Sequence, residues 1–374
     1  MTRPVVVEHS FGEPGSGGPV TALGRVLASE LSRKYDFVRM HQDEPARGID
    51  RALIRRWVAL LRRVRPDLVH VRGLGNEGFH GALAARLAGC PRVLLSIHGT
   101  VRDLQGSSNA WRRRVLVHVS EPATLRLATH VATVCRSASR REFLDPYRHK
   151  LVGEIPNGVE IHQAAPDARL GLRAELGVRK DSLVLVTVGR LSTEKGHLVL
   201  ARALRSLPRR LPRMTLLLVG DGPDREVIER AYRGVPAVEV LVLGRRLDVP
   251  ALLRAADLFV FPTLHENLSN ALLEAMAAGL PIVATSVGGN VEVLERGGGV
   301  LVPPGEPTAL AAAITRLATD RALGDRYGAE ARSVIETGYT IDDMVSRLDD
   351  VYQAILRGGD GGFARRDAAR LHSP

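Results

Sequence analysis

The chain has 374 residues, of which 25% are charged, and its formal net charge is +11 at pH 7. Only four of its 52 basic residues are lysines, the excess positive charge is spread along the chain, and aromatic residues make up 4%, so neither the basic footprint nor the base-stacking surface of a nucleic-acid-binding protein is predicted. No run approaches the roughly 18 apolar residues of a membrane span, and Cys90 and Cys135 lack the spacing of a zinc site or a disulfide framework.

Short apolar runs alternate with helix-like segments through the first half of the chain. This alternation predicts βαβ units that build a parallel sheet. The predicted strands are 4–9, 36–41, 67–72, 92–98, 130–135 and 150–156, with helical stretches that include 19–34, 50–64 and 78–88. The first strand follows the N-terminus without the apolar segment and cleavage site of a signal peptide, so we expect a cytoplasmic protein.

The second half repeats this pattern, so the predicted fold class is α/β with two Rossmann-like, doubly wound parallel-sheet domains. Its predicted strands are 182–189, 214–220, 238–244, 257–262, 281–286 and 299–303. A polar, proline-containing stretch, 156–171, has the composition of a linker. The expected divisions are an N-terminal domain over 1–163, a C-terminal domain over 164–338, a C-terminal helix over 339–357 that packs back on the N-terminal domain, and a disordered tail over 358–374.

A glycine-rich turn lies between the first predicted strand and the helix after it. Gly17 and Gly18 allow the backbone to approach a phosphate group closely. The glycine spacing does not match G-x-G-x-x-G, and Asp43 or Glu44 lies only roughly where an acidic ribose-binding residue is expected. A dinucleotide site of an NAD-dependent oxidoreductase and a turn without a ligand therefore stay open as alternatives.

His98 ends the fourth predicted strand and precedes Gly99. At the carboxyl end of a parallel strand, an imidazole can hydrogen-bond a sugar hydroxyl or transfer a proton. A structural role for this lone histidine is the alternative.

Arg190 and Lys195 flank a turn after the first strand of the second half. Two cations at this place could neutralise a diphosphate and stabilise it as a leaving group. The alternative is a pair of solvated loop side chains.

Glu266 and Glu274 stand eight residues apart around the start of a predicted helix. Eight helical residues rise about 12 Å and rotate by roughly 80°, so the two carboxylates could share one side of a site. Carboxylates accept hydrogen bonds from sugar hydroxyls, and a helix start offers backbone N–H groups to a phosphate. Those N–H groups belong to Asn267, Leu268, Ser269 and Asn270. The alternative is an amphipathic helix with two solvated glutamates.

Taken together, these segments resemble the GT-B glycosyltransferases, and specifically the retaining group called glycosyltransferase family 4. The resemblance runs through most of the chain, and the landmarks follow the family's order. They are SGGPVTALGRVLASEL, VHVRGLG, LLSIHGT, IPNGVE, VGRLSTEKGH, LLVGDGPDRE, ADLFVFPTLHENLSNALLEAMAAGLPIVATSVGGN and GGGVLVPPGEPTALAAAI. The resemblance implies two Rossmann-like domains that face each other across a cleft.

The resemblance also implies roles for the matching residues. Glu266 is similar to the glutamate near the donor hexose, Glu274 to the one that binds the ribose hydroxyls, and the backbone after Glu266 to the diphosphate-binding turn. Arg190 and Lys195 match the family's phosphate-binding pair, and Gly17 and Gly18 match its glycine loop. His98 matches its active-site histidine. Leu243 and Arg246 match the region near the nucleotide base.

Two positions depart from the family pattern. Asn267 stands where many relatives have glycine, and the usual glutamate after the later G-G pair is displaced to Glu292. These differences bear on the choice of donor hexose and on loop packing. No D-x-D motif is present, and Arg190, Lys195 and the helix start could take the place of a metal ion. We therefore expect no metal and no cofactor, with a UDP- or GDP-sugar as co-substrate.

The resemblance implies transfer of a hexose from a nucleotide diphosphate sugar to an acceptor hydroxyl, with retention at the anomeric carbon. The acceptor is expected to be a carbohydrate, a lipid-linked or a small molecule, such as a cell-surface polysaccharide or glycolipid precursor or an antibiotic. A nucleotide-sugar 2-epimerase is the main alternative, and an oxidoreductase is a weaker one.

Acceptor contacts are expected from loops of the first domain, with Asn76, Glu77, Arg102 and Asp103 as candidates. The cationic helix 51–65 carries Trp57 and could dock on an anionic membrane, which would place the protein on the inner face of that membrane. A helix with a core-facing Trp57 and an arginine-rich outer face is the alternative.

Overall fold

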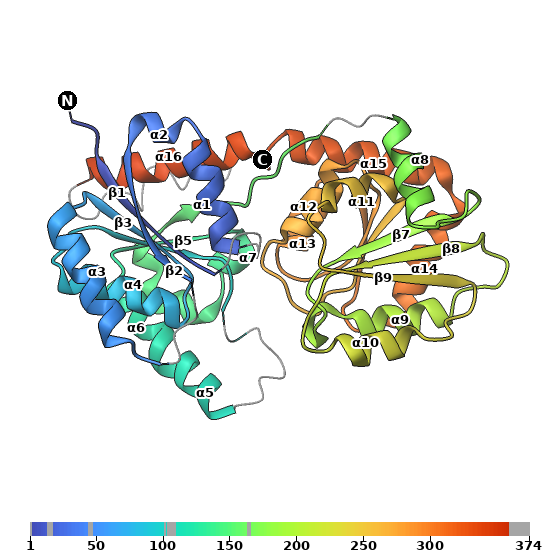
Figure 1. Ribbon diagram of the computed structural model, residues 1–374, viewed down its shortest axis with the longest axis horizontal. Helices are drawn as coiled ribbons and strands as arrows, with labels where there is room; N and C mark the ends of the chain where they lie inside the picture. Colours follow the sequence, from blue (N-terminus) through green and yellow to red (C-terminus); the bar gives the residue numbers. More distant parts are fainter. Residues whose placement is uncertain are drawn as a thin grey trace. The chain divides into compact units, whose positions relative to one another are not determined.

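The structure is a computed structural model (Figure 1), and it describes residues 2–12, 18–43, 48–100, 102, 110–162 and 166–358. The chain divides into two compact units, the first made of residues 1–157 and 341–374 and the second of residues 158–340. In each unit the described residues form one six-stranded sheet whose neighbouring strands all run parallel. The predicted fold class, α/β with two parallel sheets, is confirmed.

The first unit follows the βαβ pattern that its sequence predicts. Its strands are β1 Val5–Phe11, β2 Asp36–Gln42, β3 Leu68–Arg72, β4 Val93–Ile97, β5 His130–Thr133 and β6 Leu151–Glu154, in the order β2-β1-β3-β4-β5-β6. Its helices are α1 Gly18–Ala28, α2 Leu31–Lys34, α3 Arg51–Val64, α4 Asn76–Leu87, α5 Ala110–Val115, a π-helix Leu116–Ser120, α6 Glu121–Leu127, α7 Arg136–Ser139, a 3₁₀-helix Glu142–Lys150 and α16 Ile341–Arg357.

The second unit repeats the architecture. Its strands are β7 Leu183–Val188, β8 Met214–Val219, β9 Val238–Gly244, β10 Leu258–Phe261, β11 Ile282–Thr285 and β12 Gly299–Val302, in the order β12-β11-β10-β7-β8-β9. Its helices are α8 Pro166–Glu175, a 3₁₀-helix Thr193–Lys195, α9 His197–Arg205, α10 Arg225–Tyr232, α11 Val249–Ala255, α12 Asn270–Ala277, α13 Gly289–Leu294, α14 Pro307–Thr319 and α15 Arg321–Glu336.

Apolar side chains on both faces hold the first sheet between its helices. Successive residues of a strand point to opposite faces. Val69 and Val71 of β3 therefore pack in the cluster that includes α3 and α4, whereas Leu68 packs in the cluster that includes α16. Both faces of the sheet are therefore covered by helices, which is typical of a parallel sheet.

Helix α3 shows how local sequence decides its orientation. Asp50 caps its start by accepting a hydrogen bond from the backbone N–H of Leu53 at 2.9 Å. Trp57 is 2% exposed and meets the ring of His9 edge-on, with 5.4 Å between the ring centroids. The indole of Trp57 therefore belongs to the core, as the core-facing alternative for helix 51–65 has it.

Helix α16 is the last described helix of the chain, yet it completes the first unit. Met344, Leu348 and Tyr352 lie in the same buried cluster as strand residues Val6 and Leu68. The segment just before it belongs to the second unit, because Val159 pairs with Thr340 in an isolated parallel bridge. The units therefore divide at residues 157 and 340, whereas the sequence places the domain limits at 163 and 338. Residues 359–374 of the predicted tail lie outside the described part of the chain.

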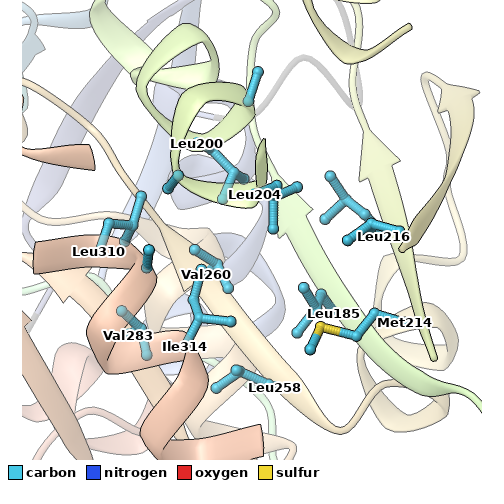
Figure 2. Packing of buried hydrophobic residues seen from close by; sticks show 14 of the residues in the cluster. Leu185, Leu200, Leu204, Met214, Leu216, Leu258, Val260, Val283, Leu310 and Ile314 are labelled. Carbon is cyan, nitrogen blue, oxygen red and sulfur yellow. The ribbon is translucent and has the colours of Figure 1, made fainter. Parts of the chain in front are cut away.

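One buried cluster of the second unit joins the sheet to α9 and α14. Figure 2 shows the side chains of these two helices packed on those of the strands. The labelled residues are Leu200 and Leu204 of α9, Leu310 and Ile314 of α14, and Leu185, Met214, Leu216, Leu258, Val260 and Val283 of the sheet. This packing fixes the strand ends that carry the candidate site.

Candidate functional site

The order in which the chain adds strands to the second sheet reverses between β7 and β10. These strands are hydrogen-bonded neighbours, with Leu258 paired to Leu185, although β8 and β9 come between them in the chain. From β7 the chain continues to β8 and β9 on one side, and from β10 it continues to β11 and β12 on the other. Loops that leave the carboxyl ends of strands at such a switch point form the usual ligand site of an open α/β sheet. The two loops here cover residues 189–196 and 262–269.

Backbone contacts bind the two loops to each other. The N–H of Leu264 donates to the carbonyl oxygen of Glu194 at 2.8 Å, and the hydroxyl of Thr263 donates to the same oxygen at 3.1 Å. Gly196 has a φ of +70°, and a Cβ there would lie 1.9 Å from the carbonyl oxygen of Pro262. The loops can approach this closely only because residue 196 is glycine.

This approach brings the predicted Lys195 and Glu266 together. The ammonium nitrogen of Lys195 donates to Oε2 of Glu266 at 2.7 Å, and the two side chains are 22% and 16% exposed. Oε1 of the same carboxylate accepts a hydrogen bond from the backbone N–H of Asn267 at 3.2 Å. One cation and one anion are therefore held at the carboxyl edge of the sheet, where the first suits phosphate oxygens and the second suits sugar hydroxyls.

A third loop, after β11, supports the backbone of Glu266. The N–H of Gly289 donates to the carbonyl oxygen of Asn267 at 2.6 Å. A Cβ on Gly288 would lie 1.8 Å from the carbonyl oxygen of Glu266, and a Cβ on Gly289 would lie 2.1 Å from that of Asn267. The sequence reasoning did not assign these two glycines to the site. The G-G pair shortly after a predicted strand is the signal that could have identified them.

Helix α12 begins at the same edge. Its N-cap is Ser269, whose hydroxyl oxygen accepts from the backbone N–H of Leu272. Asn267 and Leu268 are each 6% exposed and Ser269 is 9% exposed, so their side chains pack inward. Glu274 is half-buried on the second turn of this helix. The predicted roles of these residues toward a diphosphate and a ribose stay predictions.

Arg190 is exposed, and a histidine that the sequence reasoning missed holds the backbone beside it. Nε2 of His197 donates to the carbonyl oxygen of Arg190 at 3.0 Å. Burial lowers the pKa of His197 to about 4, so its ring is neutral at pH 7. The Arg190 side chain is thus carried on a fixed backbone, five residues before Lys195.

The two residues predicted near the base lie farther along the sheet, on and after β9. Leu243 is half-buried within β9. The guanidinium of Arg246 forms a two-pronged contact with Asp248, at 2.7 Å from Nε and 2.6 Å from Nη2. Arg246 therefore makes a local structural contact, and its predicted role toward a base stays a prediction.

In the first unit, His98 directly follows β4 and is partly buried. It lines a cavity of about 20 Å³, together with Arg72, Ser96 and Asn157. Burial, with smaller contributions from Arg72 and His70, lowers the pKa of His98 to about 3, so the ring is neutral at pH 7. Gly18 is the first residue of α1, whereas Gly17 lies outside the described residues.

The predicted acceptor residues do not form one group in the described structure. The side-chain amide of Asn76 donates to the carbonyl oxygen of Gly48 at 3.0 Å, and Glu77 lies in the first turn of α4. Arg102 donates to the buried carboxylate of Glu121 at 2.8 Å. Asp103 lies outside the described residues. Arg102 thus holds its own segment in place, and the acceptor roles stay predictions.

Among the residues that the structure describes, no three or more histidine, cysteine, aspartate or glutamate side chains gather as they would around a metal ion. None of the helices in the described ranges combines the length and the apolar character that crossing a membrane requires.

Two family models match successive parts of the chain. The family described as Glycosyltransferase Family 4 matches residues 21–163. The family described as Glycosyl transferases group 1 matches residues 182–320.

Several named glycosyltransferases are similar in sequence over most of the chain. The 2-deoxystreptamine N-acetyl-D-glucosaminyltransferase of Streptomyces fradiae is 32% identical over 324 residues, which cover 81% of this chain and 75% of the relative. A GDP-mannose-dependent α-(1-6)-phosphatidylinositol monomannoside mannosyltransferase of Mycobacterium tuberculosis is 31% identical, over 74% of this chain and 72% of the relative. The Escherichia coli UDP-Gal:α-D-GlcNAc-diphosphoundecaprenol α-1,3-galactosyltransferase is 29% identical, over 78% of this chain and 76% of the relative.

Solved structures share the fold. Anabaena HepE in complex with UDP and glucose superposes with a TM-score of 0.77 at 20% identity, over 94% of this chain and 100% of the other. The sucrose-phosphate synthase of Thermosynechococcus elongatus also gives a TM-score of 0.77, at 22% identity, over 95% and 99% of the two chains.

Proposed function

The chain belongs to glycosyltransferase family 4, the group 1 glycosyltransferases of the GT-B fold, and we propose that it moves a hexose from a UDP- or GDP-sugar to an acceptor hydroxyl with retention at the anomeric carbon. The family membership makes the protein an enzyme, a nucleotide-sugar-dependent glycosyltransferase. The sugar, the base, the acceptor and the stereochemistry are the parts that the proposal adds.

The observation that carries the proposal is the contact between Lys195 and Glu266 at the switch point of the second sheet. Their 2.7 Å ion pair joins the two loops at the place where such sheets bind ligands. Arg190 lies five residues before Lys195 and is exposed. A diphosphate at this edge would meet two cations, while the Glu266 carboxylate would accept hydrogen bonds from a hexose.

The chemistry follows from these charges. The bond between the anomeric carbon and the diphosphate oxygen breaks as the acceptor oxygen attacks the same face of the sugar. The acceptor proton passes to a leaving phosphate oxygen, and Arg190 and Lys195 stabilise the negative charge that develops on the diphosphate. His98 of the first unit, neutral at pH 7, accepts a hydrogen bond from a hydroxyl of the transferred sugar.

The base of the donor is uracil or guanine in this proposal. The names of relatives support both, since one is UDP-Gal-dependent and another is GDP-mannose-dependent. The HepE structure, which holds UDP and glucose in the same fold, favours a sugar nucleotide without selecting the base for this chain.

The acceptor in this proposal is a hydroxyl-bearing carbohydrate, lipid-linked glycan or small molecule. The relatives' names include a diphosphoundecaprenol-linked sugar, a phosphatidylinositol mannoside and 2-deoxystreptamine. We place the reaction in the cytoplasm, where sugar nucleotides are made, with contact to the inner membrane face only if the acceptor is lipid-linked.

The experiment that tests the proposal is an NMR assay of donor turnover. UDP- and GDP-hexoses are incubated with the protein and with each acceptor class, and the one-bond and vicinal couplings of the anomeric proton in the product report its configuration. We expect the product to keep the donor's configuration. A product of opposite configuration would contradict retention, and conversion of donor without any acceptor into its 2-epimer would show an epimerase instead.

A further inference from the structure

Buried hydroxyl groups join the carboxyl ends of three neighbouring strands of the second unit, β11, β10 and β7. Thr285 is the last residue of β11, and Thr263 follows β10 by two positions; they are 1% and 0% exposed. The hydroxyl of Thr285 donates to the carbonyl oxygen of Thr263. The hydroxyl of Thr263 lies 3.1 Å from the carbonyl oxygen of Glu194 and 2.8 Å from that of His265, and it can share its one hydrogen between them.

The same line of hydrogen bonds begins at Asn290. Its side-chain nitrogen Nδ2 donates to the carbonyl oxygen of Thr285 at 3.1 Å, and the residue is 0% exposed. The line then runs in one direction, from Asn290 to Thr285, Thr263 and Glu194. It ends on the peptide group that directly precedes Lys195.

The hydroxyl groups supply partners that the backbone lacks at this edge. A carbonyl group beyond the end of a strand has left the ladder of the sheet, and when it is buried it needs another donor. Threonine is β-branched, so its side chain is held in few rotamers, and a buried threonine keeps its hydroxyl in one place. Valine would fill the same space without making the hydrogen bond.

Two hydrogen bonds meet at the carbonyl oxygen of Glu194. The backbone N–H of Leu264 donates to it at 2.8 Å, and the hydroxyl of Thr263 is the second donor. The first bond holds the loop 189–196 near the loop 262–269. The second bond comes from another direction, so it restricts rotation of the peptide group that carries Lys195.

The orientation of this peptide group matters for the donor. Lys195 follows it directly, and Glu266 lies three residues after Thr263. Their charged groups meet at 2.7 Å, which sets a cation for phosphate and a carboxylate for a hexose at one separation. A displacement of about 1 Å in such a site can lower the rate by about 100-fold.

We propose that Thr263 and Thr285 are positioning residues for the donor: their hydroxyl groups set the separation of Lys195 and Glu266 that a sugar diphosphate requires. Both threonines act through the backbone of the two loops and do not contact the donor. The inference rests on the proposed function of Lys195 and Glu266. It extends the donor site to β11, the third strand of the line.

The first test measures nucleotide affinity by isothermal titration of the full-length protein with UDP and with GDP. Thr263→Val keeps the shape of the side chain and removes its hydroxyl. We expect it to weaken binding by about tenfold, because the peptide group before Lys195 loses one of its two hydrogen bonds. Thr263→Ser restores the hydroxyl and should bind nearly as the wild type does. A serine variant that binds as weakly as the valine variant would overturn the proposal. Thr285→Val and Thr285→Ser are read in the same way, and they decide the question if Thr263→Val does not fold.

Thr215→Val is the matched control for the loss of a buried hydroxyl. Thr215 lies in β8 of the same unit and is 1% exposed. Its hydroxyl is 2.8 Å from that of Ser182, near the amino ends of β7 and β8. The unfolding midpoint should fall in Thr215→Val as it does in Thr263→Val, while UDP and GDP should bind with wild-type affinity. Equal nucleotide affinities in the two valine variants would show that the position of the hydroxyl does not matter, and the proposal would fail.

The second test asks whether Thr263 acts through Lys195. If it does, the losses of nucleotide affinity in Thr263→Val and Lys195→Ala should not add. The double variant should then bind UDP or GDP only slightly less tightly than Lys195→Ala alone. Losses that add would show that Thr263 affects binding by another route and would overturn the proposal.

Crystal structures of the variants without ligand separate the positioning from the proposed function. In Thr263→Val we expect the ammonium nitrogen of Lys195 and Oε2 of Glu266 to lie more than about 4 Å apart. In Thr215→Val the contact should persist. A wild-type protein that binds no sugar nucleotide would contradict the proposed function, and the crystals would still show whether the hydroxyl groups set this separation. An intact contact in Thr263→Val would contradict the positioning role.

Discussion

Lys195 illustrates how one side chain could serve two states of the proposed donor site. In the structure its ammonium group pairs with Glu266 at 2.7 Å across two loops, and its nitrogen lies 5.9 Å from the centre of the Phe261 ring. A bound diphosphate would offer the same ammonium group stronger acceptors. The pair with Glu266 holds the cation in position until then, so little side-chain entropy remains to be lost on binding.

Lys195→Ala should weaken binding of the donor nucleotide by about 10- to 100-fold, because one charge-assisted hydrogen bond to phosphate is lost. The fold should be kept, since the side chain is partly exposed. Isothermal titration with UDP and GDP measures the change. Lys180→Ala, which removes an exposed lysine of the same unit, is the control and should bind as the wild type does. Equal affinities in the two variants would contradict the assignment of Lys195.

The buried histidines should make the protein less stable in acid. The pKa of His197 is lowered to about 4, from an ordinary value of 6.5, so below pH 6.5 the unfolded chain binds a proton that the folded chain does not. The contribution of His197 to stability is complete above 6.5 and declines as the pH falls toward 4. The thermal unfolding midpoint should fall as the pH is lowered from 6.5 toward 4, and it should fall less steeply with pH in His197→Gln.

His149→Gln is the control for this titration, because His149 is exposed. The unfolding midpoint of His149→Gln should change with pH as steeply as that of the wild-type protein. Equal slopes in both histidine variants would mean that His197 is not held neutral in the folded state.

At the scale of elements, three loops after β7, β10 and β11 are assembled by glycines that let their backbones touch. The clearest case is Gly196, which has a close contact as well as a positive φ of +70°. Gly177 has the same φ, but a Cβ there would meet nothing within 4 Å. The chain thus offers a matched pair that separates backbone strain from the fit between loops.

Gly196→Ala should cost more than Gly177→Ala. Both variants place a Cβ on left-handed backbone, at a cost of about 1–2 kcal/mol, but only the first also pushes on the carbonyl group of Pro262. We expect Gly196→Ala to lower both the unfolding midpoint and the affinity for donor nucleotide, and Gly177→Ala to lower the midpoint alone. Matching donor affinities in the two variants would show that the loop contact does not shape the site.

The elements themselves could be predicted from the sequence, because each apolar run is short and is bounded by turn residues. All of the predicted strands are present, with ends shifted by a few residues, such as 92–98 against Val93–Ile97. The approach of Lys195 to Glu266 could be expected from the ends of two parallel strands. What could not be predicted depends on contacts between distant segments: Tyr352 reaches Glu8 across 344 positions of the chain, and nothing in either local sequence indicates this.

At the scale of the whole molecule, the C-terminal helix α16 is part of the first unit's core. It contributes an apolar face, and its Tyr352 contributes a hydroxyl group that donates to the buried carboxylate of Glu8 and contacts His70 at 2.6 Å. Asp349, one turn earlier on the same helix, accepts hydrogen bonds from Tyr35 at 2.7 Å and Lys34 at 2.8 Å. The last described helix of the chain is therefore held by both apolar and polar contacts to residues near the start of the chain.

Tyr352→Phe should lower the free energy of unfolding by about 1–3 kcal/mol, since Glu8 and His70 each lose a buried partner. Urea titration of the full-length protein measures this. Tyr147→Phe is the comparison, because that hydroxyl donates a single 3.3 Å hydrogen bond, to the carbonyl oxygen of Pro122, and it should cost less. A larger loss of unfolding free energy in Tyr147→Phe than in Tyr352→Phe would contradict the stabilising role of the buried Tyr352 hydroxyl.

We propose that the second unit binds a sugar nucleotide through Lys195 and Glu266. Binding through these two residues is tested most directly by the unfolding midpoint of the full-length protein in a panel of UDP-, GDP- and ADP-sugars, because a ligand that binds only the folded state raises its stability. We predict that UDP- or GDP-sugars raise the midpoint of the wild-type protein and that Lys195→Ala removes most of this shift. A wild-type midpoint that no sugar nucleotide moves, or a shift that Lys195→Ala leaves intact, would contradict the account.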